Sequence, residues 1–400
     1  ASRGGSTGVD LANDESVTIT NGVGDNYYNI STYALDLTDG DGDVNVEMQI
    51  IQGTITLGEG DNHVEGQAVN IVATAGDGDN KFDIVGFDSP QQGALFTEDD
   101  FPTLIDLTAG DGSNIFNVFV SDDTRGSGGN GHYLAAAEVN ITAGDGGNLI
   151  QIPALPYDLT PYAGGNLPTG VLNGLIDDGN VLSTVTVNTG SGDDTIVVGG
   201  STINISSGGG TDTITLMGID NDYVTEVASL MGDSTTGGNA GVDYGYGFPD
   251  PEDGTFNFKG FTPSIFGAEL DIDTGAGSAT INLGAYDDNA GLVSGAIVAK
   301  EGSVITGSDI TLFVNTHADL RAADLSGITA VIMDDDKYTH GGQGFPAGTT
   351  SVSESASLTL LDTQFAALGQ SVFSTQGETF GAQSTLTIVI TDDTTLSQLI

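Results

Sequence analysis

The sequence predicts an all-β protein folded as a parallel β-solenoid, similar in build to a β-roll or β-helix, with about 18 residues in each coil. Three observations indicate this fold. A glycine motif recurs at a fixed interval, apolar residues alternate with polar ones on both sides of it, and the segments between the motifs are rich in Thr, Val and Ile. We also expect loop insertions between some coils and a less regular β-rich C-terminal region.

The glycine motif has the form Gly-x-Gly-x-(Asn/Asp)-x-apolar. The interval between copies is 18 residues three times in succession, and two later intervals of 34 residues indicate one coil plus a 16-residue insertion. Because glycine accepts positive φ, we expect a tight turn at each copy, including the turn at Gly76. Unrelated hairpins with Gly-Asp turns are the alternative, and the regular interval argues against them. The first glycines are Gly22, Gly40, Gly58, Gly76, Gly110, Gly144, Gly190, Gly208 and, in a degraded copy, Gly275.

The residues that flank the motif predict a strand on each side of the turn. Apolar and other side chains alternate there, which is the period of a half-buried strand. A coil of two short strands cannot bury its inward row alone, so coils must stack about 4.8 Å apart with equivalent side chains in columns. Two residues after the Asn/Asp position, every copy is apolar or aromatic: Tyr28, Val46, Val64, Phe82, Phe116, Ile150, Ile196, Ile214 and Ile281.

The composition excludes several classes of function. The 400 residues carry 56 Asp and Glu against 7 Lys and Arg, a net charge of −49. Such a chain repels phosphate backbones and anionic lipid surfaces, so we expect no nucleic-acid partner and no membrane insertion. Cysteine is absent, which excludes disulfides and thiolate chemistry, while 38% hydrophobic residues indicate a folded chain.

Acidic residues recur at two positions of the motif, between the glycines and after the second glycine. Stacking places them in columns, where unit charges about 4.8 Å apart repel by roughly 3 kcal/mol at an effective dielectric near 20. Calcium suits such columns because it takes carboxylate and carbonyl oxygens in irregular geometry. We therefore expect Ca²⁺ as a cofactor, bound by Asp25, Asp41, Asp43, Glu59, Asp61, Asp77, Asp79, Asp111, Asp145 and Asp193.

Two copies resemble a known repeat. Thr189-Gly-Ser-Gly-Asp-Asp-Thr-Ile-Val and Ser207-Gly-Gly-Gly-Thr-Asp-Thr-Ile-Thr are similar to the nonapeptide G-G-x-G-x-D-x-U-x of RTX (repeats-in-toxin) proteins. That resemblance implies a calcium-binding β-roll with Asp194 and Asp212 as ligands. The chain departs from the family pattern because the first glycine is replaced and the nonapeptide occurs once per coil. Short segments at 322–328, 365–368 and 388–396 are similar to bacterial S-layer and RTX surface proteins.

Two alternatives to specific calcium binding stay open. Asparagine fills the Asn/Asp position in most copies, and stacked asparagines can form a hydrogen-bonded amide ladder without metal. The acidity is also consistent with a solvated halophilic surface that binds no ion specifically. The asparagines concerned are Asn26, Asn62, Asn80, Asn114 and Asn148.

The pattern divides the chain into three parts. Residues 1–152 form regular coils followed by insertions at 86–103 and 121–133, residues 153–284 continue the solenoid with long loops at 153–180 and 217–262, and residues 285–400 form a less regular β region or cap. Strand-like runs persist in the last part at 307–314, 329–333, 357–361 and 385–391. Between them, residues 362–369 predict a short helix with Asp362 as its N-cap and Gly369 at its end.

We expect a secreted structural protein rather than an enzyme: a calcium-stabilised subunit of a bacterial surface layer or extracellular filament. Common catalytic motifs are missing, and the four histidines are far apart in sequence, with His63 expected at a solvated turn. Expected partners are further copies of the chain, joined head to tail or laterally, and a cell-surface polysaccharide. The alternatives are an adhesin or a module that binds ice or carbohydrate through threonine-rich strands, and a secreted enzyme with an RTX tail.

Overall fold

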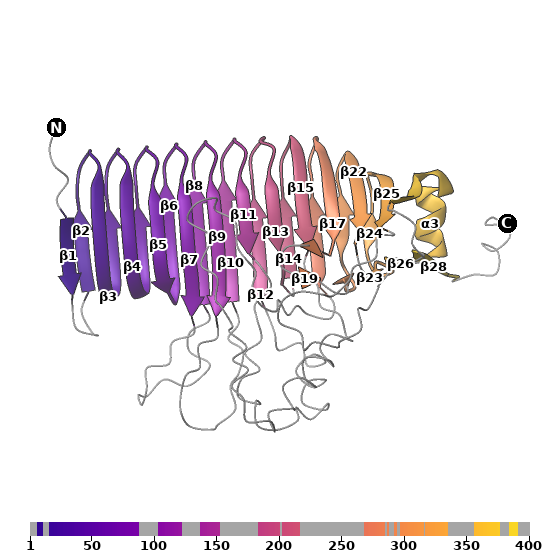
Figure 1. Ribbon diagram of the computed structural model, residues 1–400, viewed down its shortest axis with the longest axis horizontal. Coiled ribbons are helices and arrows are strands. Elements are labelled where there is room, and N and C mark those ends of the chain that lie inside the picture. Colours follow the sequence, from indigo (N-terminus) through magenta and orange to yellow (C-terminus); the bar gives the residue numbers. More distant parts are fainter. Residues whose placement is uncertain are drawn as a thin grey trace, which may run out of the picture.

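The computed structural model contains parallel strands stacked along one axis, with β1 (Ser6–Asp10) near one end of the stack and β28 (Thr385–Val389) near the other (Figure 1). The expectation of an all-β, parallel, solenoid-like fold is confirmed. The structure describes residues 6–10, 16–87, 103–121, 137–152, 183–200, 202–216, 268–284, 286–287, 292–293, 297–315, 317–334, 356–376 and 384–390.

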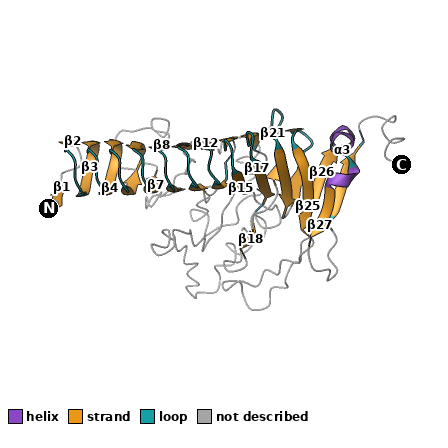
Figure 2. Cartoon of the chain, turned by 90° about the horizontal axis from the view of Figure 1, so that it is seen from above, coloured by secondary structure: helices purple, strands orange, loops and turns teal. Residues whose placement is uncertain are grey.

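The strands form two rows that face each other and are joined by turns (Figure 2). The first row contains β1 (Ser6–Asp10), the first halves of β3 (Asn26–Thr38) and β4 (Val44–Thr56), β5 (His63–Ala68), β7 (Lys81–Phe87), β9 (Ile115–Ser121), β11 (Leu149–Ile152), β13 (Thr195–Val198), β15 (Thr211–Leu216), β17 (Ser278–Leu283), β22 (Asp309–Val314), β25 (Ile328–Asp334) and β27 (Phe373–Gln376). The second row contains β2 (Ser16–Thr20), the second halves of β3 and β4, β6 (Asn70–Ala75), β8 (Thr103–Ala109), β10 (Ala137–Ala143), β12 (Ser183–Asn188), β14 (Thr202–Ser206), β16 (Glu269–Asp273), β21 (Val304–Thr306) and β24 (Asp324–Leu325).

The register of the strands follows the sequence repeat. Asn26 pairs with Val44, 18 residues further on, and the pairing stays in register across longer intervals, as for Asn70 with Leu104. Each glycine motif joins a second-row strand to the next first-row strand. The predicted insertions 86–103, 121–133, 153–180 and 217–262 lie wholly or largely outside the described residues, and each falls between a first-row strand and the next second-row strand.

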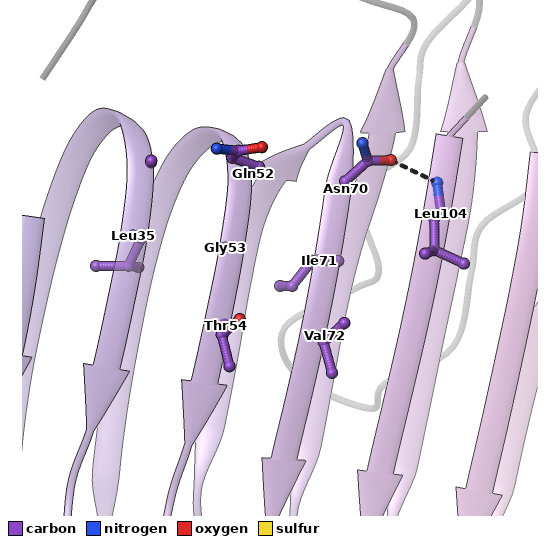
Figure 3. Close-up of a pocket in the computed structure, with 9 residues that line it drawn as sticks. Leu35, Gln52, Gly53, Thr54, Asn70, Ile71, Val72 and Leu104 are labelled. Atoms are coloured by element: carbon purple, nitrogen blue, oxygen red, sulfur yellow. Dashed lines mark hydrogen bonds between the residues drawn. The ribbon is translucent and has the colours of Figure 1, made fainter. Parts of the chain in front are cut away.

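The core lies between the two rows, because inward residues of both are apolar and form columns. Phe82 and Phe116 occupy successive coils and stack with ring centroids 5.1 Å apart and an interplanar angle of 4°. One column is interrupted at Gly53, which lies between Leu35 and Ile71 and leaves a shallow hollow (Figure 3). The Cδ1 atom of Ile50 lies 2.5 Å from the place of a Gly53 Cβ and so fills part of the missing volume.

A third row of strands begins near the C-terminal end. It contains β20 (Ile297–Val298), β23 (His317–Asp319), β26 (Ser357–Leu361) and β28 (Thr385–Val389), while β18 (Tyr286–Asp287) and β19 (Leu292–Val293) form a separate antiparallel pair. Coils in this region therefore have three strands, for example β20, β21 and β22. In a later coil, helix α3 (Asp362–Leu368) takes the place of the second-row strand: it follows β26 along the chain, as β21 follows β20 and β24 follows β23. The short 3₁₀ helix η2 (Gln370–Val372) leads from α3 to β27.

The predicted helix is present, but the prediction of its cap was wrong. Leu361 is the N-cap, and its backbone N–H donates to Oε1 of Gln364 at 2.7 Å, while Asp362 is the first helical residue and is buried. Gln364 also donates through Nε2 to the carbonyls of Leu320 and Ala323 at 2.8 and 2.7 Å. This glutamine therefore both caps the helix and ties it to the preceding coil.

The glycines of the motif serve two different purposes. The second glycine has positive φ in most copies, for example +137° at both Gly60 and Gly78. Gly76, a first glycine, does not have the positive φ that we expected. Its constraint is close approach, because a Cβ there would lie 2.9 Å from the carbonyl carbon and oxygen of Gly58 in the preceding coil.

We expect Gly60→Ala to lower the free energy of unfolding by about 2 kcal/mol, because alanine strains the positive φ and its Cβ meets the Gly42 carbonyl. Gly24→Ala is the matched control, since Gly24 also has positive φ, +128°, but its Cβ would have no neighbour within 4 Å. Chemical denaturation followed by circular dichroism measures both. Equal losses would contradict the assigned role of close coil contacts.

Candidate functional site

The polar chemistry of the described residues gathers along the edge formed by the glycine turns. Three rows of side chains run along this edge, parallel to the stacking axis. The residues between the glycines and those after the second glycine form two exposed rows, and the residues at the Asn/Asp position form a buried row. The sequence prediction that equivalent turn residues lie in columns is confirmed by the strand register on both sides.

The buried row is a continuous ladder of amides. The Nδ2 atom of each asparagine donates to Oδ1 of the next rung, at 2.9 Å from Asn62 to Asn80, 3.1 Å from Asn80 to Asn114 and 3.0 Å from Asn114 to Asn148. Each Nδ2 also donates to the carbonyls of the glycines two and four residues earlier, and each Oδ1 accepts the backbone N–H of the preceding rung. The amide therefore satisfies the turn carbonyls that a bound cation would otherwise contact.

At the N-terminal end the ladder is replaced by a different buried group. Val44 interrupts it, although the Val44 N–H still donates to Oδ1 of Asn62 at 3.2 Å. Asp39 is buried and accepts the Tyr28 hydroxyl at 2.8 Å and Nδ2 of Asn26 at 3.3 Å. Asp39 was not among the predicted site residues; the signal was an acidic residue at a position that is Leu or Ala in the next four turns.

At the C-terminal end the ladder passes from amides to carboxylates. Oδ1 of Asp194 accepts Nδ2 of Asn148 at 2.9 Å, while Oδ2 of Asp194 is buried without a hydrogen-bond partner. The Thr189 hydroxyl lies beside this carboxylate, and its oxygen also lacks a well-formed hydrogen bond. Burial raises the pKa of Asp194, and the nearby Thr189 hydroxyl and the hydrogen bonds from Asn148 oppose that rise. At this rung the carboxylate can only accept hydrogen bonds, whereas the asparagines of the preceding rungs also donate them.

Asp212, the next rung, has partners for both oxygens. Its Oδ1 accepts the Asp194 N–H at 3.1 Å, and its Oδ2 accepts the Ser207 hydroxyl at 2.6 Å. Burial raises the pKa of Asp212, which the bonds from Ser207 and Asp194 partly offset. The two aspartates that resemble the RTX ligand position are therefore adjacent and buried, and only Asp194 has an oxygen without a partner.

The exposed rows are held by the backbone of the next coil. Oδ1 of Asp43 accepts the Asp61 N–H at 3.0 Å, and Oδ1 of Asp61 accepts the Asp79 N–H at 2.9 Å. The backbone N–H and then the hydroxyl of Ser191 lower the pKa of Asp145. One row contains Asp25, Asp43, Asp61, Asp79 and Asp193, and the other contains Asp41, Glu59, Asp77, Asp111 and Asp145.

These contacts use one oxygen of most of the exposed carboxylates and leave the second toward solvent. Outside the three rows, the described residues include a group formed by the side chains of His63, Glu65 and Asp83. One nitrogen or oxygen atom of each side chain lies within 4.8 Å of the corresponding atoms of the other two. His63 was expected at a solvated turn. It is instead the first residue of β5 and is half-buried, and its Nε2 contacts the Asp83 carboxylate on β7.

Comparison with protein families, curated proteins and solved structures finds no match to this chain. Among the described residues, no helix has the length and apolar character needed to cross a lipid bilayer.

We expect Asn114→Ala to lower the free energy of unfolding by about 3 kcal/mol, because it removes the side-chain donor to the Gly112 carbonyl and the acceptor of the Asn80 backbone N–H, and it breaks the ladder between Asn80 and Asn148. Asn29→Ala, which removes an exposed amide bonded to Glu47, should change it by less than about 0.5 kcal/mol. Denaturant titration of both variants measures the difference, and a small loss for Asn114→Ala would show that the ladder is not structural.

Proposed function

We propose that this protein is a structural rod: a closed β-solenoid, stabilised by calcium, that serves as a secreted subunit of a bacterial surface layer or extracellular filament. The observation that carries the proposal is the direction of the polar contacts. The buried amide row and the bonds of the exposed carboxylates join one coil to the next along the axis. Such contacts stabilise a long scaffold.

The ends of the stack support self-association. Among the described strands, β1 and β2 pair only with β3, and β27 and β28 pair only with β25 and β26. Strands with one unpaired edge can accept a strand from another chain. A head-to-tail contact between the two ends is heterologous and extends into a filament without closing.

The Asp194 carboxylate supports a role for calcium. In the preceding rungs the Nδ2 group donates to two glycine carbonyls, and Asp194 lacks those hydrogens while its Oδ2 is buried without a partner. The chemistry of this place, with carboxylate, hydroxyl and carbonyl oxygens, fits Ca²⁺. Asp194 and Thr189 would hold the ion, and calcium in the exposed rows would reduce the repulsion between stacked carboxylates.

Chelation should lower the melting temperature of the wild-type protein at physiological salt, because the stacked acids and Asp194 lose their counter-ions. Asp194→Asn should melt higher than wild type in chelator, by the equivalent of about 1–3 kcal/mol, since the amide supplies the missing donor. It should also gain less from added calcium. Asp36→Asn, an exposed acid outside the turns, is the control for loss of charge alone. A melting temperature that chelator does not change would overturn the calcium assignment.

Electron microscopy of the purified protein with calcium should reveal filaments or sheets, because the open strand edges favour head-to-tail contacts. Analytical ultracentrifugation over a range of concentrations should show growth of large species. Monomers that persist at high concentration would contradict the assembly proposal and favour a binding module.

One observation favours a binding module as the second candidate. Six threonines are in register on the outward side of the second row, and all but the half-buried Thr108 are exposed. A flat threonine array of this kind could bind ice or carbohydrate, although Asp36 and Asp106 in the adjacent column place charge beside it. The members of the array are Thr20, Thr38, Thr56, Thr74, Thr108 and Thr142. Thr213 and Thr215 do not belong to it, because they lie in the first row on β15. Thermal hysteresis of the monomer would identify an ice-binding function.

A further inference from the structure

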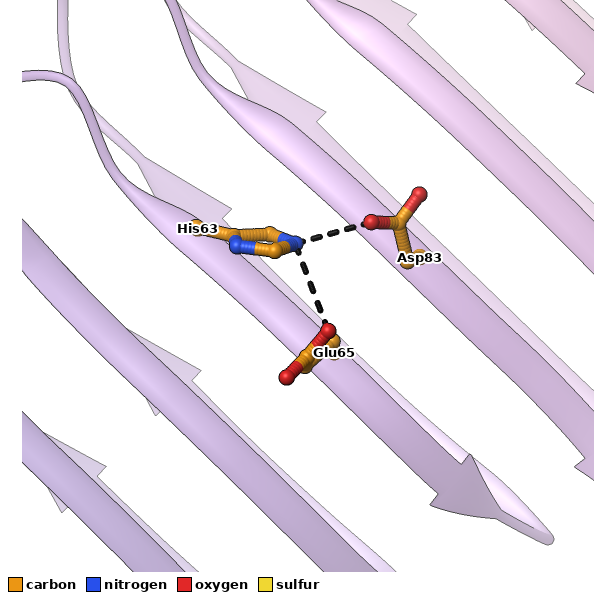
Figure 4. Close-up of side chains that lie close together, drawn as sticks. All are labelled: His63, Glu65 and Asp83. Atoms are coloured by element: carbon orange, nitrogen blue, oxygen red, sulfur yellow. Dashed lines mark hydrogen bonds and ion pairs between the residues drawn. The ribbon is translucent and has the colours of Figure 1, made fainter. Parts of the chain in front are cut away.

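A compact group of ionisable side chains lies on the outward side of β5 and β7, at the strand ends that directly follow the glycine turns (Figure 4). The strand register places His63 beside Lys81 and Glu65 beside Asp83. Nε2 of His63 lies 2.8 Å from Oδ2 of Asp83 and 3.8 Å from Oε2 of Glu65, and the three ligand atoms lie within 4.8 Å of one another. An imidazole nitrogen and two carboxylates thus converge on one point.

We propose that His63, Glu65 and Asp83 bind one divalent transition-metal ion, for which Zn²⁺ is the probe. Imidazole and carboxylate ligands suit zinc and its neighbours. Tetrahedral zinc with bonds of about 2.1 Å separates its ligand atoms by about 3.4 Å. The separations of 2.8 and 3.8 Å lie on either side of that value, so small side-chain rotations bring the three atoms to bonding distance.

The local charge favours a divalent cation. Glu47, Glu65 and Asp83 follow one another in a single column of adjacent coils, and like charges directly opposite each other are destabilising. Lys81 lies within reach, with Nζ at 3.0 Å from Oδ2 of Asp83, but it supplies one charge against three.

Neighbouring amides complete the surroundings of the group. Asn117 donates through Nδ2 to Oδ1 of Asp83 at 2.7 Å, which fixes the carboxylate while its other oxygen faces His63. Such outer contacts orient metal ligands. Asn45 pairs with His63 from the preceding coil, and its Oδ1 is buried without a hydrogen-bond partner. The strand register makes this amide oxygen the candidate for a fourth ligand.

Calorimetric titration of the untagged full-length protein with Zn²⁺, in excess calcium to occupy the acidic turns, tests the proposal. Wild type should bind one zinc ion at this group. His63→Ala and His63→Gln should each weaken that binding at least about tenfold, as loss of a ligand requires. Lys81→Met should strengthen it, because the ammonium group competes for Oδ2 of Asp83. His317→Ala, in β23, is the control and should bind zinc as wild type does.

The proposal is overturned if zinc does not bind in excess calcium, if both His63 variants bind it as wild type does, or if Lys81→Met weakens it. Circular dichroism of the metal-free variants checks that each is folded. Co²⁺ offers a second readout, since its visible absorption should depend on His63. The result is independent of the calcium proposal, which concerns the turns and an ion that imidazole binds poorly.

Discussion

In-register stacking of the coils is the constraint on which the rest of the structure depends. Parallel pairing places each residue about 4.8 Å from its equivalent in the next coil, so one repeated residue becomes a row. Asparagine suits such a row because its amide donates on one side and accepts on the other. The four buried asparagines from Asn62 to Asn148 therefore bond to one another and to the turn carbonyls, and no charged group is needed between them.

Aspartate does not suit a buried row, because a carboxylate only accepts. The exposed aspartates avoid the difficulty by accepting a backbone N–H from the next coil and keeping their second oxygen in water. Asp194 cannot do this, since it is buried and its Oδ2 has no partner. The two kinds of aspartate therefore differ in their surroundings: the charge of the exposed rows is in contact with water, whereas the Asp194 carboxylate is buried with one oxygen unpaired.

The choice of residue is less constrained in the columns that face outward than in those that face the core. Inward positions must fill the core, while outward positions accept almost any residue that tolerates its neighbours in the adjacent coils. This freedom allows the threonine column on the second row and the His63, Glu65 and Asp83 group on the first. In both cases the side chains concerned face outward, while the inward residues keep the core apolar. Outward side chains can therefore be replaced without altering the fold.

The sequence by itself determined the interval between coils, the strands that flank each glycine turn and the apolar columns of the core, because these depend only on the period and on residue type. It also placed the acidic residues in columns and left open whether an amide ladder or metal filled the turn. The tertiary structure decided the hydrogen bonds: the direction of the ladder, the burial of Asp39 against Tyr28, and the cap of α3 at Leu361 instead of Asp362. It also brought His63 to Asp83, a diagonal contact between coils. Periodicity specifies which residues are neighbours, but only the packed coils specify which atoms meet, because side-chain rotamers and burial are settled by the neighbours on every side.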